Sequence, residues 1–382
     1  MFDRSEQEKA AQTLRKVLND TRGKSRRAFL QDLGKAAAGS ALLTTFHGML
    51  AGRAEAQETA PVTTMGWGGE WDDRIAAAYY TPFTEKSGTA VQVIPYSTPK
   101  VLAMHEAGTM EVDFLLGAGL DTPMLIDKGV AAPIDWSVVD KDALTPNQLA
   151  YGDYAIGGST LSYVMAYNTR RWPGDDHLKS WADFWDVEKS PGPRSLGRYT
   201  AYPTLEFALL ADGVAKEDLY PLDLDRAFAS LDRIKPHISS WWETGGQQQQ
   251  LMEDMEVDLL YVWNGRGTVT IRDNGAPFAF MWNEAAYQGE VEAWLAMEGG
   301  PNPKSTMQIL DWLGRAEPQA AFARVMYYGP TNLKAYDLLE PELADILPSS
   351  PKNLPPQFPI DWGWWAETFD TAQRRFEEWL QA

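Results

Sequence analysis

The side chains with the clearest chemical potential in this sequence are tryptophans that stand beside carboxylates. Trp67 and Trp71 flank Glu70, and Trp282 precedes Glu284 by two positions. Aromatic faces attract organic cations by cation–π interaction, and carboxylates add charged hydrogen bonds. The same faces can also stack on sugars. With sixteen Trp in 382 residues, the chain is expected to use some of them for binding, although any single tryptophan belongs more often to the core.

A second candidate position lies in the stretch Val257–Gly267, VDLLYVWNGRG. Its apolar run, Val257–Val262, predicts a strand buried on both faces, as in a parallel sheet. The Asn-Gly pair that follows is expected to stop the strand, and a helix is predicted from Gly267 to Asp273. Trp263 then lies at the carboxyl end of a strand, where open sheets bind ligands. Its ring is either a ligand platform or a lid on the core, and the other Trp–acid pairs favour the platform.

Catalytic and metal-binding patterns are missing from the sequence. The chain has no Cys, which excludes disulfides, thiolate nucleophiles and Cys-ligated metals. The four His are scattered, and no nucleophile elbow, phosphate-binding loop or dinucleotide fingerprint is present. We therefore predict no catalytic residues, no metal and no cofactor. A carbohydrate hydrolase that uses two acids remains an alternative, because Asp and Glu are numerous enough for a pair to meet.

The charge and the length of the chain narrow the class of protein further. A formal net charge of −19 would repel nucleic acid and anionic membrane surfaces, so neither is expected as a partner. A chain of 382 residues with 44% hydrophobic residues can bury a large core and is expected to form two lobes.

The first 56 residues resemble an export signal. The run Ser25–Leu30, SRRAFL, is similar to the twin-arginine motif; a mildly apolar stretch, Ala36–Leu50, follows it, and Ala54–Ala56 is an A-x-A cleavage pattern. This order predicts a twin-arginine signal peptide over residues 1–56 and a periplasmic protein. Since no Cys is available for lipid attachment, the mature protein is expected not to be lipid-anchored. The alternative is an amphipathic helix of the folded protein.

Strands and helices alternate along the rest of the chain. This alternation predicts an α/β lobe with a mainly parallel sheet at the start of the mature chain. The sequence further predicts a short strand at Ala293–Met297 and a final amphipathic helix at Trp362–Leu380. The predicted early elements are strands at 63–67, 90–95 and 112–116 and helices at 71–87, 99–107 and 123–128.

The order of three motifs resembles a known family. Ser180–Trp185 (SWADFW), the VWNG turn around Trp263, and Tyr328–Asn332 (YGPTN) are similar to segments of the spermidine/putrescine-binding proteins. These belong to the family 1 extracellular solute-binding proteins of ABC importers. The resemblance implies a type II periplasmic binding protein fold, with two α/β lobes, a ligand cleft and hinge crossings.

The resemblance also implies lobe boundaries and site residues. Lobe 1 is expected to comprise residues 57–165 and 292–335, and lobe 2 residues 166–291 and 336–382, with crossings near 165, 292 and 335. The pocket residues carried over by position are Trp67, Glu206, Trp263, Glu292 and Tyr328.

Three departures from the family pattern affect the expected ligand. Pro203 replaces an acid of the family, Gly117-Ala118-Gly119-Leu120-Asp121 replaces its Ser/Tyr pair, and Glu290 replaces its Trp two positions before Glu292. Asp121 is expected to supply the missing charge.

These observations predict the periplasmic substrate-binding component of an ABC importer. The expected ligand is a polyamine-like cation of the putrescine or spermidine type, captured by a monomer and delivered to an inner-membrane permease. Ligand that bridges the lobes would shift an open–closed equilibrium toward the closed form. The alternative is the same fold with a neutral or anionic ligand, such as a sugar or a carboxylate.

Overall fold

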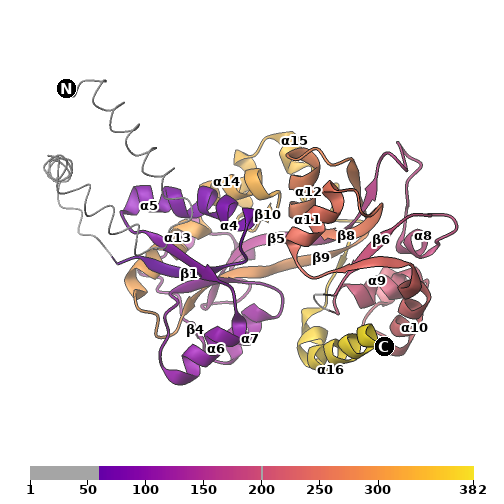
Figure 1. Ribbon diagram of the computed structural model, residues 1–382. Coiled ribbons are helices and arrows are strands. Elements are labelled where there is room, and N and C mark those ends of the chain that lie inside the picture. Colours follow the sequence, from indigo (N-terminus) through magenta and orange to yellow (C-terminus); the bar gives the residue numbers. More distant parts are fainter. Residues whose placement is uncertain (1–59, 199–200) are drawn as a thin grey trace, which may run out of the picture. The chain divides into compact units, whose positions relative to one another are not determined.

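The computed structural model describes residues 60–198 and 201–382 (Figure 1). The predicted export signal, residues 1–56, lies outside the described residues. Residues 59–382 form one unit by their contacts, and this unit holds every predicted site residue.

Most of the strands belong to one mixed sheet. Its main path is ordered β11-β9-β5-β8-β6-β7, with β10 paired to β5 and with β3 and β4 paired to β9. The strands of the described residues are β1 Val62–Gly66, β2 Val91–Pro95, β3 Phe114–Gly117, β4 Ala131–Ala132, β5 Ala155–Asn168, β6 Arg194–Gly197, β7 Ile238–Trp242, β8 Leu259–Trp263, β9 Phe278–Met297, β10 Gly329–Pro330 and β11 Phe358–Pro359.

Helices fill the connections between these strands (Figure 1). The α-helices of the described residues are α4 Glu70–Ile75, α5 Thr81–Ser87, α6 Thr98–Ala107, α7 Asp121–Asp127, α8 Trp181–Trp185, α9 Thr204–Ala211, α10 Leu224–Ile234, α11 Gly245–Glu253, α12 Asn264–Arg272, α13 Pro303–Gly314, α14 Ala316–Met326, α15 Pro341–Ala344 and α16 Trp362–Gln381. A π-helical turn, Ala76–Tyr80, joins α4 to α5, so residues 70–87 are helical throughout, as predicted.

Two long strands run through the middle of the described chain. β5 has 14 residues and β9 has 20, and they pair antiparallel along most of their lengths. The prediction of a short strand at Ala293–Met297 is therefore wrong in extent, because the polar stretch before it continues the same strand. The β5–β9 register shifts at four places between Gly157 and Met165. Such irregularities bend and twist a strand pair locally.

The predicted mainly parallel sheet of the first lobe is only partly correct. β1 and β2 pair parallel, whereas β3 and β4 pair antiparallel with β9. The partner of β3 comes from a distant part of the chain, which local strand–helix alternation does not reveal. The α/β class itself is confirmed.

The stretch that contains Trp263 forms a strand followed at once by a helix. β8 pairs parallel with β6 but antiparallel with β5, and α12 begins at Asn264 rather than at Gly267. The Asn-Gly pair is thus the first turn of the helix and not a separate loop. Gly265 is required by a close approach, because a β-carbon there would overlap the ring of Tyr328 and the carbonyl oxygen of Met326.

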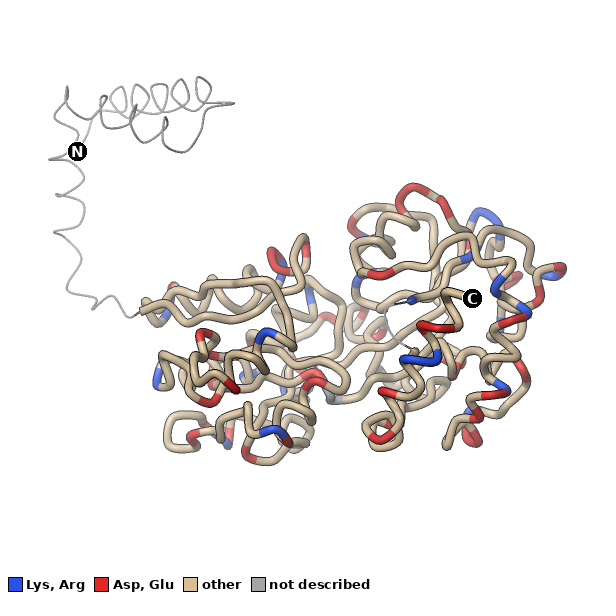
Figure 2. Tube along the Cα trace, turned by 60° about the horizontal axis from the view of Figure 1, so that its bottom comes forward, with Lys and Arg blue, Asp and Glu red and all other residues tan. Residues whose placement is uncertain are grey.

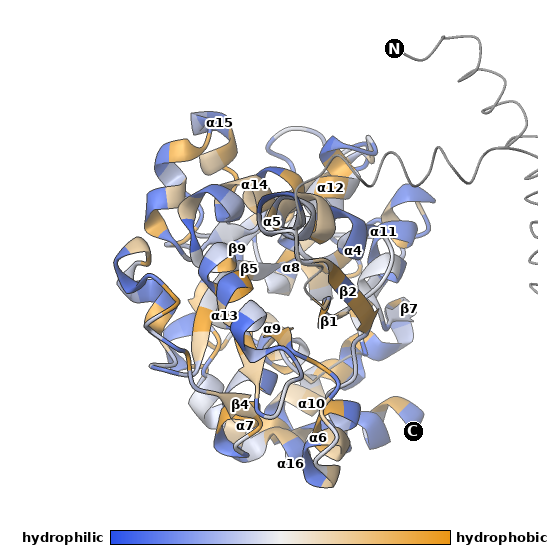
Figure 3. Ribbon diagram, turned by 90° about the vertical axis from the view of Figure 1, so that its left-hand side faces the viewer, coloured by the Kyte–Doolittle hydropathy of each residue, from blue (hydrophilic) through white to orange (hydrophobic). Residues whose placement is uncertain are grey.

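Surface helices bury one side only. In α16, Trp365 and Phe376 are fully buried while most of its acidic residues are exposed. Figure 3 shows the same mixture of hydrophilic and hydrophobic residues along α16 and the mainly hydrophobic colour of β2. Acidic residues are spread along the described chain and interleaved with basic ones (Figure 2), which is typical of a solvated surface.

Candidate ligand-binding site

A cavity of about 710 Å³ opens beside the carboxyl ends of β1 and β8. This volume is in the range of small-molecule sites. Segments from distant parts of the sequence line it. Five of the six predicted residues are among them: Trp67, Asp121, Trp263, Glu292 and Tyr328. Glu206 does not line this cavity.

The aromatic walls of the cavity are held by other rings. Trp67 stacks on Tyr96 with 4.7 Å between centroids and meets Trp71 edge-on at 5.5 Å. Trp263 is 5.3 Å from Trp242 and 6.1 Å from the buried Tyr163, again between centroids. Rings packed on rings lose little freedom when a ligand arrives, so the walls are pre-organised.

Asp121 is the first residue of α7 and is partly buried at the cavity wall. Two hydroxyl groups donate to its Oδ2, Tyr96 at 2.8 Å and Thr98 at 3.1 Å. Burial raises the pKa of this carboxyl, and the two hydrogen bonds oppose that shift. Because both donors use the same oxygen, Oδ1 is available to a ligand.

Glu292 lies on β9 and is only 4% exposed. Ser159 of β5, at one of the register shifts, donates a hydrogen bond to its Oε2. Burial raises the pKa of Glu292 to about 7, while the hydrogen bond from Ser159 and the positive charge of Arg266 oppose this shift. A cation that approaches Glu292 stabilises the ionised form of this carboxyl, since a nearby positive charge lowers its pKa.

Glu206 was predicted to hold an amine, but the structure places it away from the cavity. Its Oε1 accepts hydrogen bonds from the Tyr220 hydroxyl at 2.6 Å and from Trp365 Nε1 at 2.8 Å, and the residue is fully buried. Burial raises its pKa to about 7. Trp365 belongs to α16, so the C-terminal helix closes over this carboxyl. The packing of α16 is a tertiary event that motif position does not convey.

Arg266 is the basic residue among the described residues that line the cavity, and it was not predicted from the sequence. It lies in the first turn of α12, is partly buried, and lines the cavity. Its guanidinium is 5.5 Å from the ring centroid of Trp71. A β-carbon at Gly245 would overlap it, so that glycine leaves it room. Burial lowers the pKa of Arg266, and the charges of the surrounding acidic and phenolic groups oppose this.

A signal for Arg266 was present in the sequence. The positive end of the helix dipole disfavours basic residues in a first turn, and α12 has no acidic residue there. An arginine in that position therefore indicates a function outside the helix. Binding of a ligand in the cavity is such a function, because a guanidinium binds a carboxylate in bidentate fashion.

The described lining of the site thus combines aromatic walls, one basic residue, Arg266, and five acidic residues: Glu70, Asp121, Glu243, Glu253 and Glu292. Glu292 and Asp121 can hold an ammonium group, and Arg266 can hold a carboxylate. In the part of the chain that the structure describes, no group of His, Asp and Glu could hold a metal ion. The arrangement is suited to capture of an organic ion without chemistry.

Comparison with known proteins defines the class. Residues 78–349 match the bacterial extracellular solute-binding protein family, and the chain belongs to it. It is a substrate-binding protein of an ABC transporter and not an enzyme. Within residues 60–198 and 201–382, none of the helices has the length and apolarity that a membrane crossing requires.

Individual relatives differ in what they bind. The gamma-aminobutyric acid-binding protein of Pseudomonas aeruginosa is 30% identical over 348 residues, which cover 88% of this chain and 95% of that protein. The spermidine/putrescine-binding periplasmic protein of Escherichia coli is 23% identical over 326 residues, covering 81% and 89%. The binding protein AgtB of A. tumefaciens R10, solved with agropinic acid, is 31% identical with a TM-score of 0.76, and the match covers 85% of this chain and 99% of that one. The predicted resemblance to the spermidine/putrescine-binding proteins is confirmed at the level of the family.

Proposed function

We propose that this protein captures a small zwitterion that carries both a carboxylate and an amine, of the γ-aminobutyrate type. The observation that carries the proposal is Arg266 in the cavity wall. A polyamine has no anionic group to pair with this guanidinium and would be repelled by it. A zwitterion instead offers one partner to Arg266 and one to the acids.

The roles of the other side chains follow from their chemistry. The ammonium group of the ligand is bound by Glu292 and by Oδ1 of Asp121. The methylene groups between the two charges pack on Trp67 and Trp263. Tyr328, a buried cavity residue, supports the wall beside Arg266 and Glu292, and burial raises its pKa, so it remains neutral at physiological pH.

The comparisons support this ligand class over the polyamine that the sequence first indicated. The relative at 30% identity is a γ-aminobutyrate-binding protein, and the spermidine/putrescine relative is at 23%. A polyamine-like cation remains the competing ligand, because five acidic residues and aromatic walls line the same cavity.

Isothermal titration calorimetry decides between the two ligands. The mature protein is titrated with γ-aminobutyrate, putrescine and spermidine. We expect γ-aminobutyrate to bind and Arg266→Met, which keeps the length of the side chain, to weaken binding about a hundredfold, since a charged hydrogen-bonded pair in a closed site is worth about 1.5–3 kcal/mol.

Arg272→Met is the matched control, because Arg272 is exposed at the other end of the same helix. Binding of γ-aminobutyrate that survives Arg266→Met unchanged would contradict the role of the guanidinium. Tight binding of putrescine with no binding of γ-aminobutyrate would restore the polyamine assignment.

The route to the periplasm is also part of this proposal. We expect residues 1–56 to act as a twin-arginine signal, and the free monomer to deliver its ligand to an inner-membrane permease. Replacing Arg26 and Arg27 by Lys should leave precursor in the cytoplasm, measured by cell fractionation. Normal delivery of this variant would exclude the twin-arginine route.

A further inference from the structure

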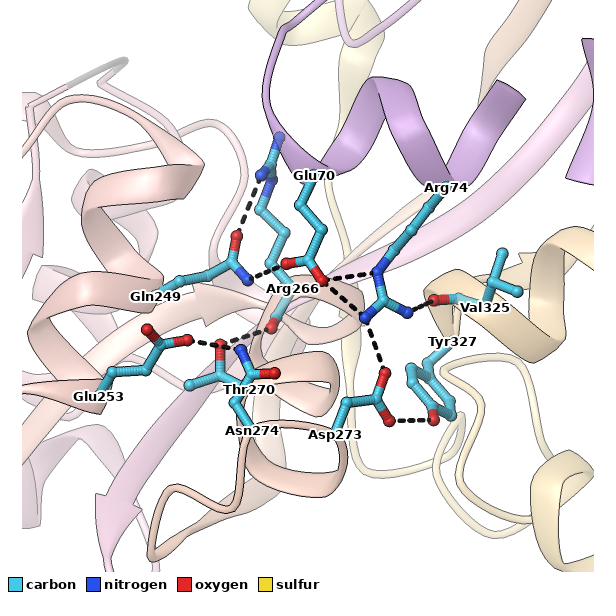
Figure 4. A network of polar contacts seen from close by, with 10 residues as sticks. All are labelled: Glu70, Arg74, Gln249, Glu253, Arg266, Thr270, Asp273, Asn274, Val325 and Tyr327. Carbon is cyan, nitrogen blue, oxygen red and sulfur yellow. Dashed lines mark hydrogen bonds and ion pairs between the residues drawn. The ribbon is translucent and has the colours of Figure 1, made fainter. Parts of the chain in front are cut away.

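Gln249 of α11 connects two side chains from different walls of the cavity. Its Oε1 accepts a hydrogen bond from Nη1 of Arg266 at 3.2 Å, and its Nε2 donates one to Oε2 of Glu70 at 3.3 Å (Figure 4). The orientation of the amide follows from chemistry, because a guanidinium only donates and a carboxylate only accepts. Both Gln249 and Glu70 line the cavity.

The Glu70 end of this connection is held firmly. Oε1 of Glu70 accepts from Nε of Arg74 at 3.0 Å and from its Nη2 at 2.7 Å. Arg74 also pairs with Asp273 at 2.9 Å and donates to the carbonyl oxygen of Val325 at 2.7 Å. The Glu70 carboxylate therefore keeps one oxygen turned to Arg74 and the other to Gln249 (Figure 4).

The two partners of Gln249 come from parts of the chain that belong to different predicted lobes. Glu70 lies in α4, directly after β1, within residues 57–165. Arg266 and Gln249 lie in α12 and α11, within residues 166–291. The hydrogen bond from Gln249 to Glu70 thus joins the two predicted lobes, as do the pair of Arg74 with Asp273 and the hydrogen bond from Asn264 to Tyr327.

We propose that Gln249 is a positioning residue that couples ligand capture at Arg266 to closure of the cleft through Glu70. The proposal rests on the proposed function for the role of Arg266. A carboxylate bound to the guanidinium fixes its orientation, and this fixes the amide that accepts from it. The same amide then presents Nε2 to Glu70, so that the closed arrangement is favoured when ligand is present.

A swap of the two side chains tests this connection. Gln249→Glu keeps an acceptor for Arg266 but sets a carboxylate against the carboxylate of Glu70. We expect affinity for γ-aminobutyrate to fall about three- to tenfold, as for a partly exposed charged contact. Adding Glu70→Gln restores a donor–acceptor pair with its direction reversed, and affinity should return to within about twofold of the wild type.

A second measurement reports the cleft itself and does not depend on knowing the ligand. Because the chain has no Cys, Lys100→Cys and Glu217→Cys give two unique, exposed labelling positions in the two predicted lobes. Spin labels at these positions measure the distance across the cleft. We expect Gln249→Glu to lengthen the mean distance in ligand-free protein, and the swapped pair to reverse the change.

The control is Gln92→Glu, since Gln92 is exposed on β2 and does not line the cavity. It should change neither affinity nor distance. An unchanged distance in Gln249→Glu, or a swapped pair no better than the single variant, would overturn the proposal. Failure of the wild type to bind γ-aminobutyrate would refute the proposed function instead. The spin-label distances in ligand-free protein would still test whether the contact between Gln249 and Glu70 holds the cleft closed.

Discussion

Two buried glutamates occupy contrasting environments in this protein. Glu292 and Glu206 both have pKa values raised to about 7 by burial. Glu292 faces the cavity and shares the electrostatic field of Arg266, whereas Glu206 is covered by Trp365 of α16 and bonded to Tyr220. The carboxyl of Glu292 can contact a ligand, whereas the carboxyl of Glu206 contacts only other side chains of the protein.

The contrast shows that a perturbed carboxyl is not by itself evidence of a binding site. Burial shifts the pKa of both groups in the same direction, so the shift does not distinguish them. What distinguishes them is the open space beside Glu292 and the guanidinium that also borders that space.

The stability of the protein should fall as pH rises because of Glu206. Its folded pKa, about 7, lies above the usual value of 4.5, so the folded protein keeps a proton that the unfolded chain loses. The stabilisation is complete below pH 4.5 and is lost as pH rises through about 7. One pKa unit corresponds to about 1.4 kcal/mol, so the loss from this group is on the order of 3 kcal/mol.

Glu206→Gln removes this titration and should reduce the fall in stability between pH 5 and pH 8 by about that amount, as measured by urea unfolding, while the part caused by the similarly raised pKa of Glu292 remains. The amide keeps an acceptor for Tyr220 and Trp365. Affinity for γ-aminobutyrate should remain the same, since Glu206 lies outside the cavity lining. A loss of affinity at constant stability would instead place Glu206 in the ligand site.

Glu292→Gln, unlike Glu206→Gln, should weaken ligand binding. It removes the charge that meets the ammonium group but keeps the size of the side chain and an acceptor for Ser159. We expect affinity to fall ten- to a hundredfold, about 1.4–2.8 kcal/mol, measured by calorimetry at pH 8. The melting temperature at that pH should not decrease, because a costly buried charge is also removed. Unchanged affinity would show that the ammonium group binds elsewhere, with Asp121 as the next candidate.

Trp263→Ala should give the smallest effect of this series. The ring packs beside Trp242 and Tyr163 at the cavity edge, and each ligand methylene group buried against it is worth about 0.8 kcal/mol. Affinity should fall about three- to thirtyfold, and most of the ligand-induced change in tryptophan fluorescence should disappear. If the variant unfolds while the fluorescence response of the remaining folded protein is intact, Trp263 serves the core rather than the ligand.

Much of the fold and of the site could be predicted from local patterns. The apolar run before Trp263 determines a buried strand, and the acidic first turn after Trp67 agrees with a helix start, because both depend on neighbours in sequence. The motif that contains Asn264 and Gly265 is visible in the sequence, but the contacts that require these two residues are not. That reason is tertiary: Asn264 accepts from the backbone of Ser162 and donates to the carbonyl of Tyr327, and Gly265 leaves room for Tyr328.

The sequence by itself determined the α/β class, the solute-binding family and the aromatic and acidic residue types of the site. Only the tertiary structure decided which acid is open and which is sealed. Glu206 is covered by a residue 159 positions away, and Arg266 acquires its role from a cavity built by segments on either side of it. Burial and electrostatic fields depend on distance in space, and local sequence carries no information on which distant side chains come within that distance.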